Sequence, residues 1–321
     1  MATGLPPVLA PALANAPMTR SDNLTGALLM MASMAAFTLN DTMMKAMAGQ
    51  VPLFQLLFLR GVLTTVAVAV VAWRMGAFGA RPPRRDWKVI AWRTLAEIGA
   101  AYFFLTALFS MPIANVTAIL QALPLTITLA AWLVLKEPVG WRRLLAIVVG
   151  FGGVMLIIRP GAADFNVFSL YALAAVGFVT LRDLSTRRLS GATPSVLVTL
   201  ITSAAVMAFF GLADLGGDWA AMGRAQMGLT AGAALMIIGG YLFSIMVMRV
   251  GEIGFVAPFR YTGLIWALVL GWLVFGEWPE ALTLLGAGIV AGSGLYTLWR
   301  ESRLARAARI AQSARANPRG M

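Results

Sequence analysis

Residues 194–212 read PSVLVTLITSAAVMAFFGL, a stretch that carries no charged side chain. A helix needs about 20 largely apolar residues to cross the hydrocarbon core of a bilayer. The apolar run is continuous rather than alternating, which is typical of a membrane-spanning helix and not of a barrel strand. Ten such stretches occur along the 321 residues: 24–44, 53–73, 87–108, 114–135, 141–158, 168–186, 194–212, 227–248, 255–275 and 281–299. The sequence therefore predicts an all-α membrane protein with ten transmembrane helices.

The composition excludes most other classes of protein. Apolar residues make up 60% of the chain and charged residues only 12%, and the mean hydropathy is +0.82. An average soluble domain has about 25% charged residues. Because the chain has no cysteine and no histidine, it lacks thiol nucleophiles, zinc-finger ligands, haem-ligating histidines and imidazole bases. We therefore expect neither an enzyme nor a cofactor or metal site.

The basic residues indicate how the chain is oriented. If the N-terminus lies in the cytoplasm, 18 of the 25 Lys and Arg residues fall on the cytoplasmic side and only three on the other side. Basic residues concentrate in the cytoplasmic loops of membrane proteins. We therefore expect both termini in the cytoplasm and the chain in a bacterial inner membrane. The net charge of +12 is then a signal of topology and not of nucleic-acid binding.

The two ends of the chain lie outside the predicted spans. Residues 1–23 hold a weak apolar run that Pro6, Pro7 and Pro11 interrupt and that no basic residue precedes, so we expect a disordered cytoplasmic arm rather than a signal peptide. At the other end, arginines recur every three residues from Arg300 to Arg309. This spacing predicts a basic helix face in the cytoplasmic tail, residues 301–321, that binds anionic lipid.

The second half of the chain repeats the first. A shift of 142 residues aligns Thr38–Asp41 with Thr180–Asp183, and shifts of 142 or 140 pair further residues. These pairs are Lys45 with Arg187, Gly49 with Gly191, Pro52 with Pro194, Trp132 with Trp272 and Glu137 with Glu277. They predict two five-helix repeats, residues 24–161 and 166–300, and because five is odd the second repeat is inverted in the membrane. Inverted repeats are typical of secondary transporters, whose binding site lies between the halves.

Specific motifs accompany the repeat. In the first half they are Pro112-Ile113-Ala114, Pro124, Glu137-Pro138, Gly150-Phe151-Gly152-Gly153-Val154 and Arg159-Pro160-Gly161, and in the second Ala257-Pro258, Tyr261, Gly271-Trp272, Glu277 and Gly292-Ser293-Gly294. This pattern resembles the drug/metabolite transporter superfamily, the EamA-type carriers, over about residues 24–300. The resemblance implies ten helices, cytoplasmic termini and a central cavity that opens alternately to each side.

The resemblance leaves a range of solutes open. Members of the superfamily move amino acids, riboflavin, S-adenosylmethionine, nucleotide sugars and drugs, in either direction. The segment Asn40-Asp41 followed by Lys45 is similar to bacterial carriers of the S-adenosylmethionine and riboflavin kind.

Several charged side chains fall inside the predicted spans, where an ionised group costs about 2.5–3.5 kcal/mol on insertion scales. They are Asp41, Arg60, Arg93, Glu97, Arg182, Asp183 and Arg260. Arginine presents a planar fork to carboxylate and phosphate oxygens. One interpretation is therefore a cavity of positive potential for an anionic or zwitterionic solute, with Arg260 as the main substrate contact. The other is mutual neutralisation, since Arg93 and Glu97 lie four residues apart on one helix face.

Five of these residues are candidates for coupling or gating. Since the chain has no histidine, a transported proton would need a carboxylate, and Glu97 is the acid nearest mid-depth. The pair Arg182-Asp183 aligns with Asn40-Asp41, so we interpret the two as gates at opposite ends, with a purely stabilising role as the alternative. Arg60 fits either a gate or an ion pair with Asp41.

Uncharged side chains complete the predicted substrate site. Gln121 precedes Pro124, which removes a helix hydrogen bond near mid-depth and frees a carbonyl, as is tolerated beside a cavity. Four aromatic side chains are suited to stacking on a flat ring, although packing also explains each alone: Tyr102, Tyr241, Tyr261 and Trp266.

These features favour a secondary active transporter that moves a small organic metabolite by alternating access. We expect an amino-acid-like, aromatic, nucleoside-like or cofactor-like solute, the riboflavin and S-adenosylmethionine types included, with proton coupling as a hypothesis. The alternative is a channel or an integral membrane enzyme, although the chain has no Gly-x-Ser-x-Gly motif and no histidine-based metal motif. The sequence leaves open the solute, the direction, the coupling ion and the oligomeric state.

Overall fold

Ten helical segments long and apolar enough to cross a membrane dominate the structure. The computed structural model describes residues 20–137, 139–162, 165–250 and 253–316, and within these ranges it has helices and no strand. The ten segments are Asp22–Lys45, Leu53–Arg74, Arg84–Ser110, Ile113–Leu135, Trp141–Ile158, Phe168–Thr186, Ser195–Ala213, Arg224–Val247, Ala257–Phe275 and Ala281–Leu304. Each overlaps one predicted span, so the predicted fold class is confirmed.

Eight of the spans are single helices in the described residues. They are α2 (Arg20–Lys45), α3 (Leu53–Arg74), α4 (Arg84–Ser110), α7 (Trp141–Ile158), α8 (Phe168–Thr186), α9 (Ser195–Ala213), α10 (Arg224–Val250) and α13 (Ala281–Ala316). A short 3-10 helix, η1 (Ala77–Gly79), follows α3.

Spans four and nine are both interrupted. Span four consists of α5 (Ile113–Leu120) and α6 (Leu123–Leu135), and span nine of α11 (Ile253–Val256), the 3-10 turn η2 (Ala257–Tyr261) and α12 (Thr262–Phe275). A proline stands in the first turn of both α6 and η2, because proline has no N–H to continue a helix but is compatible with its start. Interrupted helices at corresponding places in two halves are typical of transporters.

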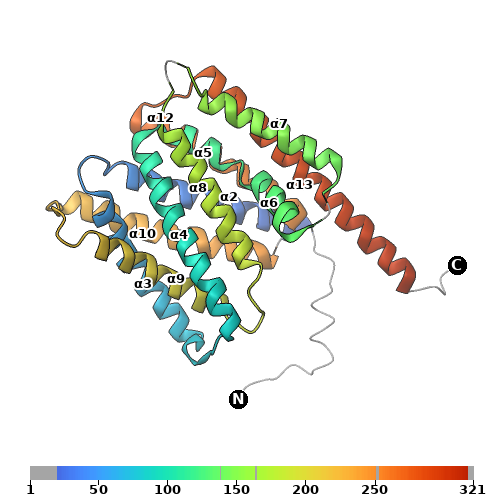
Figure 1. The fold of residues 1–321 in the computed structure, drawn as a ribbon, viewed down its shortest axis with the longest axis horizontal. Coiled ribbons are helices and arrows are strands. Elements are labelled where there is room, and N and C mark those ends of the chain that lie inside the picture. The colour runs from blue at the N-terminus through green and yellow to red at the C-terminus, as the bar shows by residue number, and fades with distance from the viewer. Residues whose placement is uncertain (1–19, 138, 163–164, 251–252, 317–321) are drawn as a thin grey trace.

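The most extensive helix contacts join the two halves of the chain. In Figure 1, α7 lies beside α13 and α3 beside α9, and α2 and α4 pack in the same way on α10 and α8. In the duplication α2 corresponds to α8 and α10 to α4, so the α2–α10 and α8–α4 pairs are equivalent. The α3–α9 and α7–α13 pairs each join two corresponding helices. This is the pattern that a duplicated chain predicts, while the inverted orientation of the second half stays a prediction.

Glycine permits the close approach of α7 and α13. A Cβ on Gly153 would lie 2.8 Å from the Gly286 carbonyl oxygen, and one on Gly286 would lie 2.6 Å from the Gly153 carbonyl oxygen. Membrane helices associate mainly through van der Waals packing, which small residues allow. The two backbones can therefore touch only because neither position has a side chain.

Three buried apolar clusters hold the bundle, and α5 takes part in the two larger ones. One cluster includes Val116 and Val154, and the other includes Met44 and Phe210. Ile113, at the start of α5, belongs to the second cluster. The first turn of α5 packs on α12, since a Cβ on Gly271 would lie 3.0 Å from Ile113 Cγ2.

The two ends of the chain are described in part. The helix α2 begins at Arg20, inside the range expected for the N-terminal arm, and residues 1–19 lie outside the described residues. At the other end α13 continues past the bundle to Ala316 (Figure 1). The Arg303 guanidinium lies over the Trp299 ring at 4.9 Å. Residues 317–321 of the expected basic tail lie outside the described residues.

Candidate functional site

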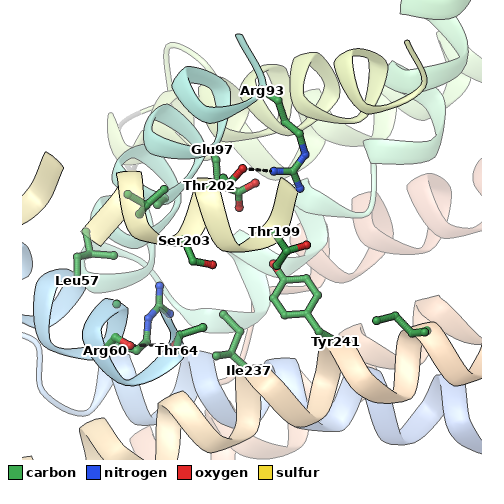
Figure 2. Close-up of a pocket in the computed structure, with 14 residues that line it drawn as sticks. Leu57, Arg60, Thr64, Arg93, Glu97, Thr199, Thr202, Ser203, Ile237 and Tyr241 are labelled. Carbon is green, nitrogen blue, oxygen red and sulfur yellow. Dashed lines mark hydrogen bonds between the residues drawn. The ribbon is translucent and has the colours of Figure 1, made fainter. Parts of the chain in front are cut away.

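A cavity of about 180 Å³ lies among α3, α4, α9 and α10, as Figure 2 shows. Because α3 and α4 come from the first half of the chain and α9 and α10 from the second, the cavity lies between the halves. Its wall is formed by Leu57, Arg60, Gly61, Thr64, Arg93, Glu97, Ala101, Thr199, Thr202, Ser203, Val206, Ile237, Tyr241 and Ile245. The wall combines apolar side chains with charged and hydroxyl groups, and small-molecule sites use such polar groups to orient the ligand.

Arg93 is held by hydroxyl groups and not by an acid. Its Nε donates to Thr186 Oγ1 over 3.0 Å, and its Nη1 donates to Thr202 Oγ1 over 2.7 Å. These bonds tie α4 to α8 and α9. The expected pairing of Arg93 with Glu97 is wrong, because Glu97 turns to α8 and binds another arginine.

Glu97 and Asp183 both pair with Arg182. The Arg182 Nη1 atom lies 3.4 Å from Glu97 Oε1 and 3.5 Å from Oε2, and Arg182 Nε donates to Asp183 Oδ1 over 2.8 Å. All three side chains are partly exposed. The contacts to Glu97 are long for hydrogen bonds, so this carboxylate keeps acceptor capacity toward the cavity.

Arg60 reaches Asp41 through an intermediate side chain. Arg60 Nη1 donates to Asn40 Oδ1 over 3.2 Å, and Asn40 Nδ2 donates to Asp41 Oδ1 over 2.8 Å. Asn40 thus stands between the two groups for which the sequence suggested an ion pair. The bond to Asn40 uses one of the five N–H donors of the guanidinium, and Arg60 lines the cavity while Asp41 does not.

Tyr241 supplies an aromatic wall. Its ring packs edge-on against Phe37, with 5.2 Å between ring centroids, and the side chain lines the cavity from α10. In Figure 2 the Tyr241 ring, Arg60, Arg93 and Glu97 surround one space. Three of the predicted site residues, Arg60, Glu97 and Tyr241, are therefore brought together.

Hydroxyl groups on α9 complete the wall, and the sequence interpretation missed them. Thr199, Thr202 and Ser203 all line the cavity. They are spaced three and four residues apart, which places them on one helix face. This spacing was the signal in the sequence that could have identified them.

The other predicted substrate contacts lie outside this wall. Gln121 lies at the interruption of span four, next to Gly263, whose Cβ would be 3.7 Å from Gln121 Nε2. Tyr261 is buried, and Arg260 is exposed on η2. Their roles in binding stay predictions.

Two predicted aromatic contacts also lie elsewhere. Tyr102 packs against Phe54 and Phe103, with centroid distances of 6.1 and 5.2 Å. Trp266, on α12, is 36% exposed. In the part of the chain that the structure describes, no group of three or more acidic side chains is placed to hold a metal ion.

Comparisons with known proteins point to one family. The profile of the EamA-like transporter family matches residues 24–159. The chain is 30% identical over 253 residues to a riboflavin transporter of Vibrio cholerae serotype O1, covering 77% of this chain and 84% of the relative. It is 24% identical over 286 residues to an S-adenosylmethionine uptake transporter of Rickettsia prowazekii, covering 87% and 94%.

A solved crystal structure shows the same fold. It is 17% identical in sequence and has a TM-score of 0.59, over 88% of this chain and 99% of that chain. Together with the riboflavin transporter, which is matched over most of its length, this likeness fits a ten-span protein whose cavity lies between its halves. The chain therefore belongs to the EamA-like transporter family of the drug/metabolite transporter superfamily, and it is a multi-pass membrane transporter rather than an enzyme.

Proposed function

We propose that this chain is a secondary active transporter for a solute with a flat heteroaromatic ring and a polar tail. Riboflavin and S-adenosylmethionine, named for the two relatives, are both solutes of this kind. The transporter would work by alternating access in a bacterial inner membrane. Its parts would be a cytoplasmic arm (1–23), two inverted repeats (24–161 and 166–300) and a tail (301–321) that binds anionic lipid.

One observation carries the proposal: an aromatic ring and two guanidinium groups line the same cavity. The Tyr241 ring can stack on a planar heterocycle. Arg60 and Arg93 can donate to carboxylate or carbonyl oxygens of the solute, and Glu97 can accept from an amine or a ring N–H. The cavity therefore suits a solute that carries acceptors at one end and donors at another.

The size of the cavity supports a change of shape during transport. Its volume of about 180 Å³ is below the range of about 300–1,000 Å³ for sites of drug-sized ligands. A cofactor-sized solute would require the walls to separate. Such separation is what alternation between two states would provide.

Uptake by purified protein in liposomes tests the proposal. We would measure saturable uptake of labelled riboflavin and labelled S-adenosylmethionine, and compare the variants Arg60→Ala, Tyr241→Ala and Arg260→Ala. We expect Arg60→Ala and Tyr241→Ala to raise KM, because each removes a side chain that lines the cavity. Folding of each variant is checked by its thermal unfolding and its elution in gel filtration.

The Arg260→Ala variant decides between two places for the site. If it abolishes uptake while Arg60→Ala does not, the solute binds near η2 and the cavity proposal is wrong. A thermal-shift screen against metabolites identifies the solute independently, because a ligand that binds only the folded state must stabilise it.

A further inference from the structure

Two of the ion pairs that join the halves of the chain lie at opposite ends of the bundle. Lys45, at the end of α2, pairs with Glu277, just after α12, with 2.9 Å between Nζ and Oε1. Arg187, just after α8, pairs with Glu137, just after α6, with 3.7 Å between Nη1 and Oε1. The first pair lies beside Ile113, where span four begins, and the second lies where that span ends. The length of one span therefore separates them.

The duplication relates the two pairs to each other. A shift of 142 residues aligns Lys45 with Arg187, and a shift of 140 aligns Glu137 with Glu277. In both pairs a cation of one half binds an acid of the other half. The two pairs are therefore equivalent contacts, related to each other by exchanging the two halves of the chain.

The backbone presents both acids in the same way. The helices α6 and α12 end in left-handed residues, Lys136 with φ of 56° and Gly276 with φ of 66°, a conformation that commonly ends helices. The N–H of the glutamate that follows donates to the carbonyl six residues earlier, over 3.3 Å for Glu137 and 3.0 Å for Glu277. This matching geometry supports the equivalence independently of the alignment.

The two pairs differ in how tightly they are held. The second carboxylate oxygen of Glu277 accepts from the Ile113 N–H over 3.1 Å, and Lys45 also donates to the Met111 carbonyl. The side chains of Lys45 and Glu277 are 9% and 26% exposed, against 51% and 52% in the other pair. A half-exposed pair with so long a separation contributes little. The Lys45–Glu277 pair is therefore the tighter of the two, and Arg187–Glu137 is the looser.

The cavity lies nearer the end that carries the looser pair, Arg187–Glu137. Its Arg93 donates to Thr186, which directly precedes Arg187. The helix α4, which carries Arg93, also begins at that end, because Asp86 in its first turn accepts hydrogen bonds from Ser190 in the α8–α9 loop. The loose ion pair thus lies at the end to which the cavity is nearer.

We propose that Lys45–Glu277 and Arg187–Glu137 are the two gates of the transporter, closed in turn. In this structure both pairs are formed, the Lys45–Glu277 gate tightly and the Arg187–Glu137 gate weakly. With the orientation that the basic residues predict, the tightly held gate faces the periplasm and the weakly held one the cytoplasm. The assignment rests on the proposed alternating access, and it differs from the expected gates at Asp41 and Arg182-Asp183.

A single cysteine in the cavity reports which gate is open. Since the chain has no cysteine of its own, Ser203→Cys would place the only thiol on the cavity wall. The full-length protein, in right-side-out or inside-out vesicles, is exposed to a membrane-impermeant maleimide. We expect labelling of Ser203→Cys mainly from the Arg187 end.

Weakening each gate separately gives the decisive comparison. Adding Glu277→Gln should raise labelling from the Lys45 end several-fold and lower it from the Arg187 end, because the tightly held gate loses its charge pair. Adding Glu137→Gln should not raise labelling from the Lys45 end. The control is Glu280→Gln, which breaks the Arg159–Glu280 pair of 2.5 Å between α7 and the α12–α13 loop and should leave labelling unchanged.

A charge exchange keeps the test valid if single variants fold poorly. Lys45→Glu places two acids together, and the double variant Lys45→Glu with Glu277→Lys should restore the wild-type labelling from both ends. Labelling that changes equally from both ends, or that the Glu280→Gln control changes as much as Glu277→Gln does, overturns the gates. Because labelling needs no solute, a wrong solute in the uptake assay has no bearing on this outcome.

Discussion

The phenol of Tyr261 fills the space that Gly294 leaves by having no side chain. A Cβ on Gly294 would overlap the Tyr261 hydroxyl oxygen and would lie 2.7 Å from Cζ of the ring. Tyr261 is only 8% exposed, and its hydroxyl has no hydrogen-bond partner among the described residues. In this state the ring therefore packs η2 against α13 and does not face the cavity.

The first prediction follows from this contact. Gly294→Ala should destabilise the protein by about 1–3 kcal/mol, the usual cost of overpacking, because the buried ring must move. Thermal unfolding in detergent measures the effect. The control is Gly292→Ala on the same helix, whose Cβ would meet nothing within 4 Å. Adding Tyr261→Phe to Gly294→Ala should recover part of the loss, and equal stability of the two glycine variants would contradict the packing.

The Glu97→Gln variant should show whether Glu97 carries the coupled proton or only stabilises the fold. The variant should fold, because Arg182 keeps its 2.8 Å bond to Asp183 and so is not left without an acid. If Glu97 carries the proton, accumulation driven by a pH gradient should disappear while solute exchange continues. Both are measured in the same liposomes. Loss of exchange together with accumulation would show that Glu97 has a structural role instead.

Thr202→Val should weaken solute binding by releasing Arg93. A hydrogen bond to a charged group contributes about 1.5–3 kcal/mol, so we expect KM to rise by about tenfold. Thr106→Val is the control, because the Thr106 hydroxyl donates to the Tyr102 carbonyl of its own helix and does not line the cavity. The proposed role of Thr202 fails if uptake kinetics show the same KM for both variants.

Reporter fusions test the orientation of the chain. A reporter that works only in the periplasm should be silent after Met321 and active when inserted near Gly216, in the α9–α10 connection. The expectation follows from the excess of basic residues on one side. The reverse pattern would overturn the orientation, and with it the assignment of the Lys45–Glu277 gate to the periplasmic side.

The ten spans could be predicted from sequence because the length of an apolar run is a local property. The residues 194–212, without a charge, became α9, and the interruption of span four could be expected from Pro124. The charged residues of the cavity could also be predicted from the sequence. Arg60 and Glu97 stand out because ionised groups inside a membrane are costly.

The partners of these groups could not be predicted in the same way. The helix rule that pairs residues four apart suggested Arg93 with Glu97, but α8 and α9 bring Thr186, Thr202 and Arg182 closer. Helix packing, which the local sequence does not encode, decides that choice. Hydroxyl groups on α9 were missed because a threonine can satisfy itself on its own helix, so residue type alone gives no signal and only their spacing on one helix face marks them.

The pairing of helices across the halves has a consequence for biogenesis. The helix α2 is complete at Lys45, but its main partner α10 begins only at Arg224. Until then the polar face of α2, which includes the Ser33 hydroxyl that later donates to the Gly240 carbonyl, has no final partner in the bilayer. Insertion of the early helices must therefore precede their assembly.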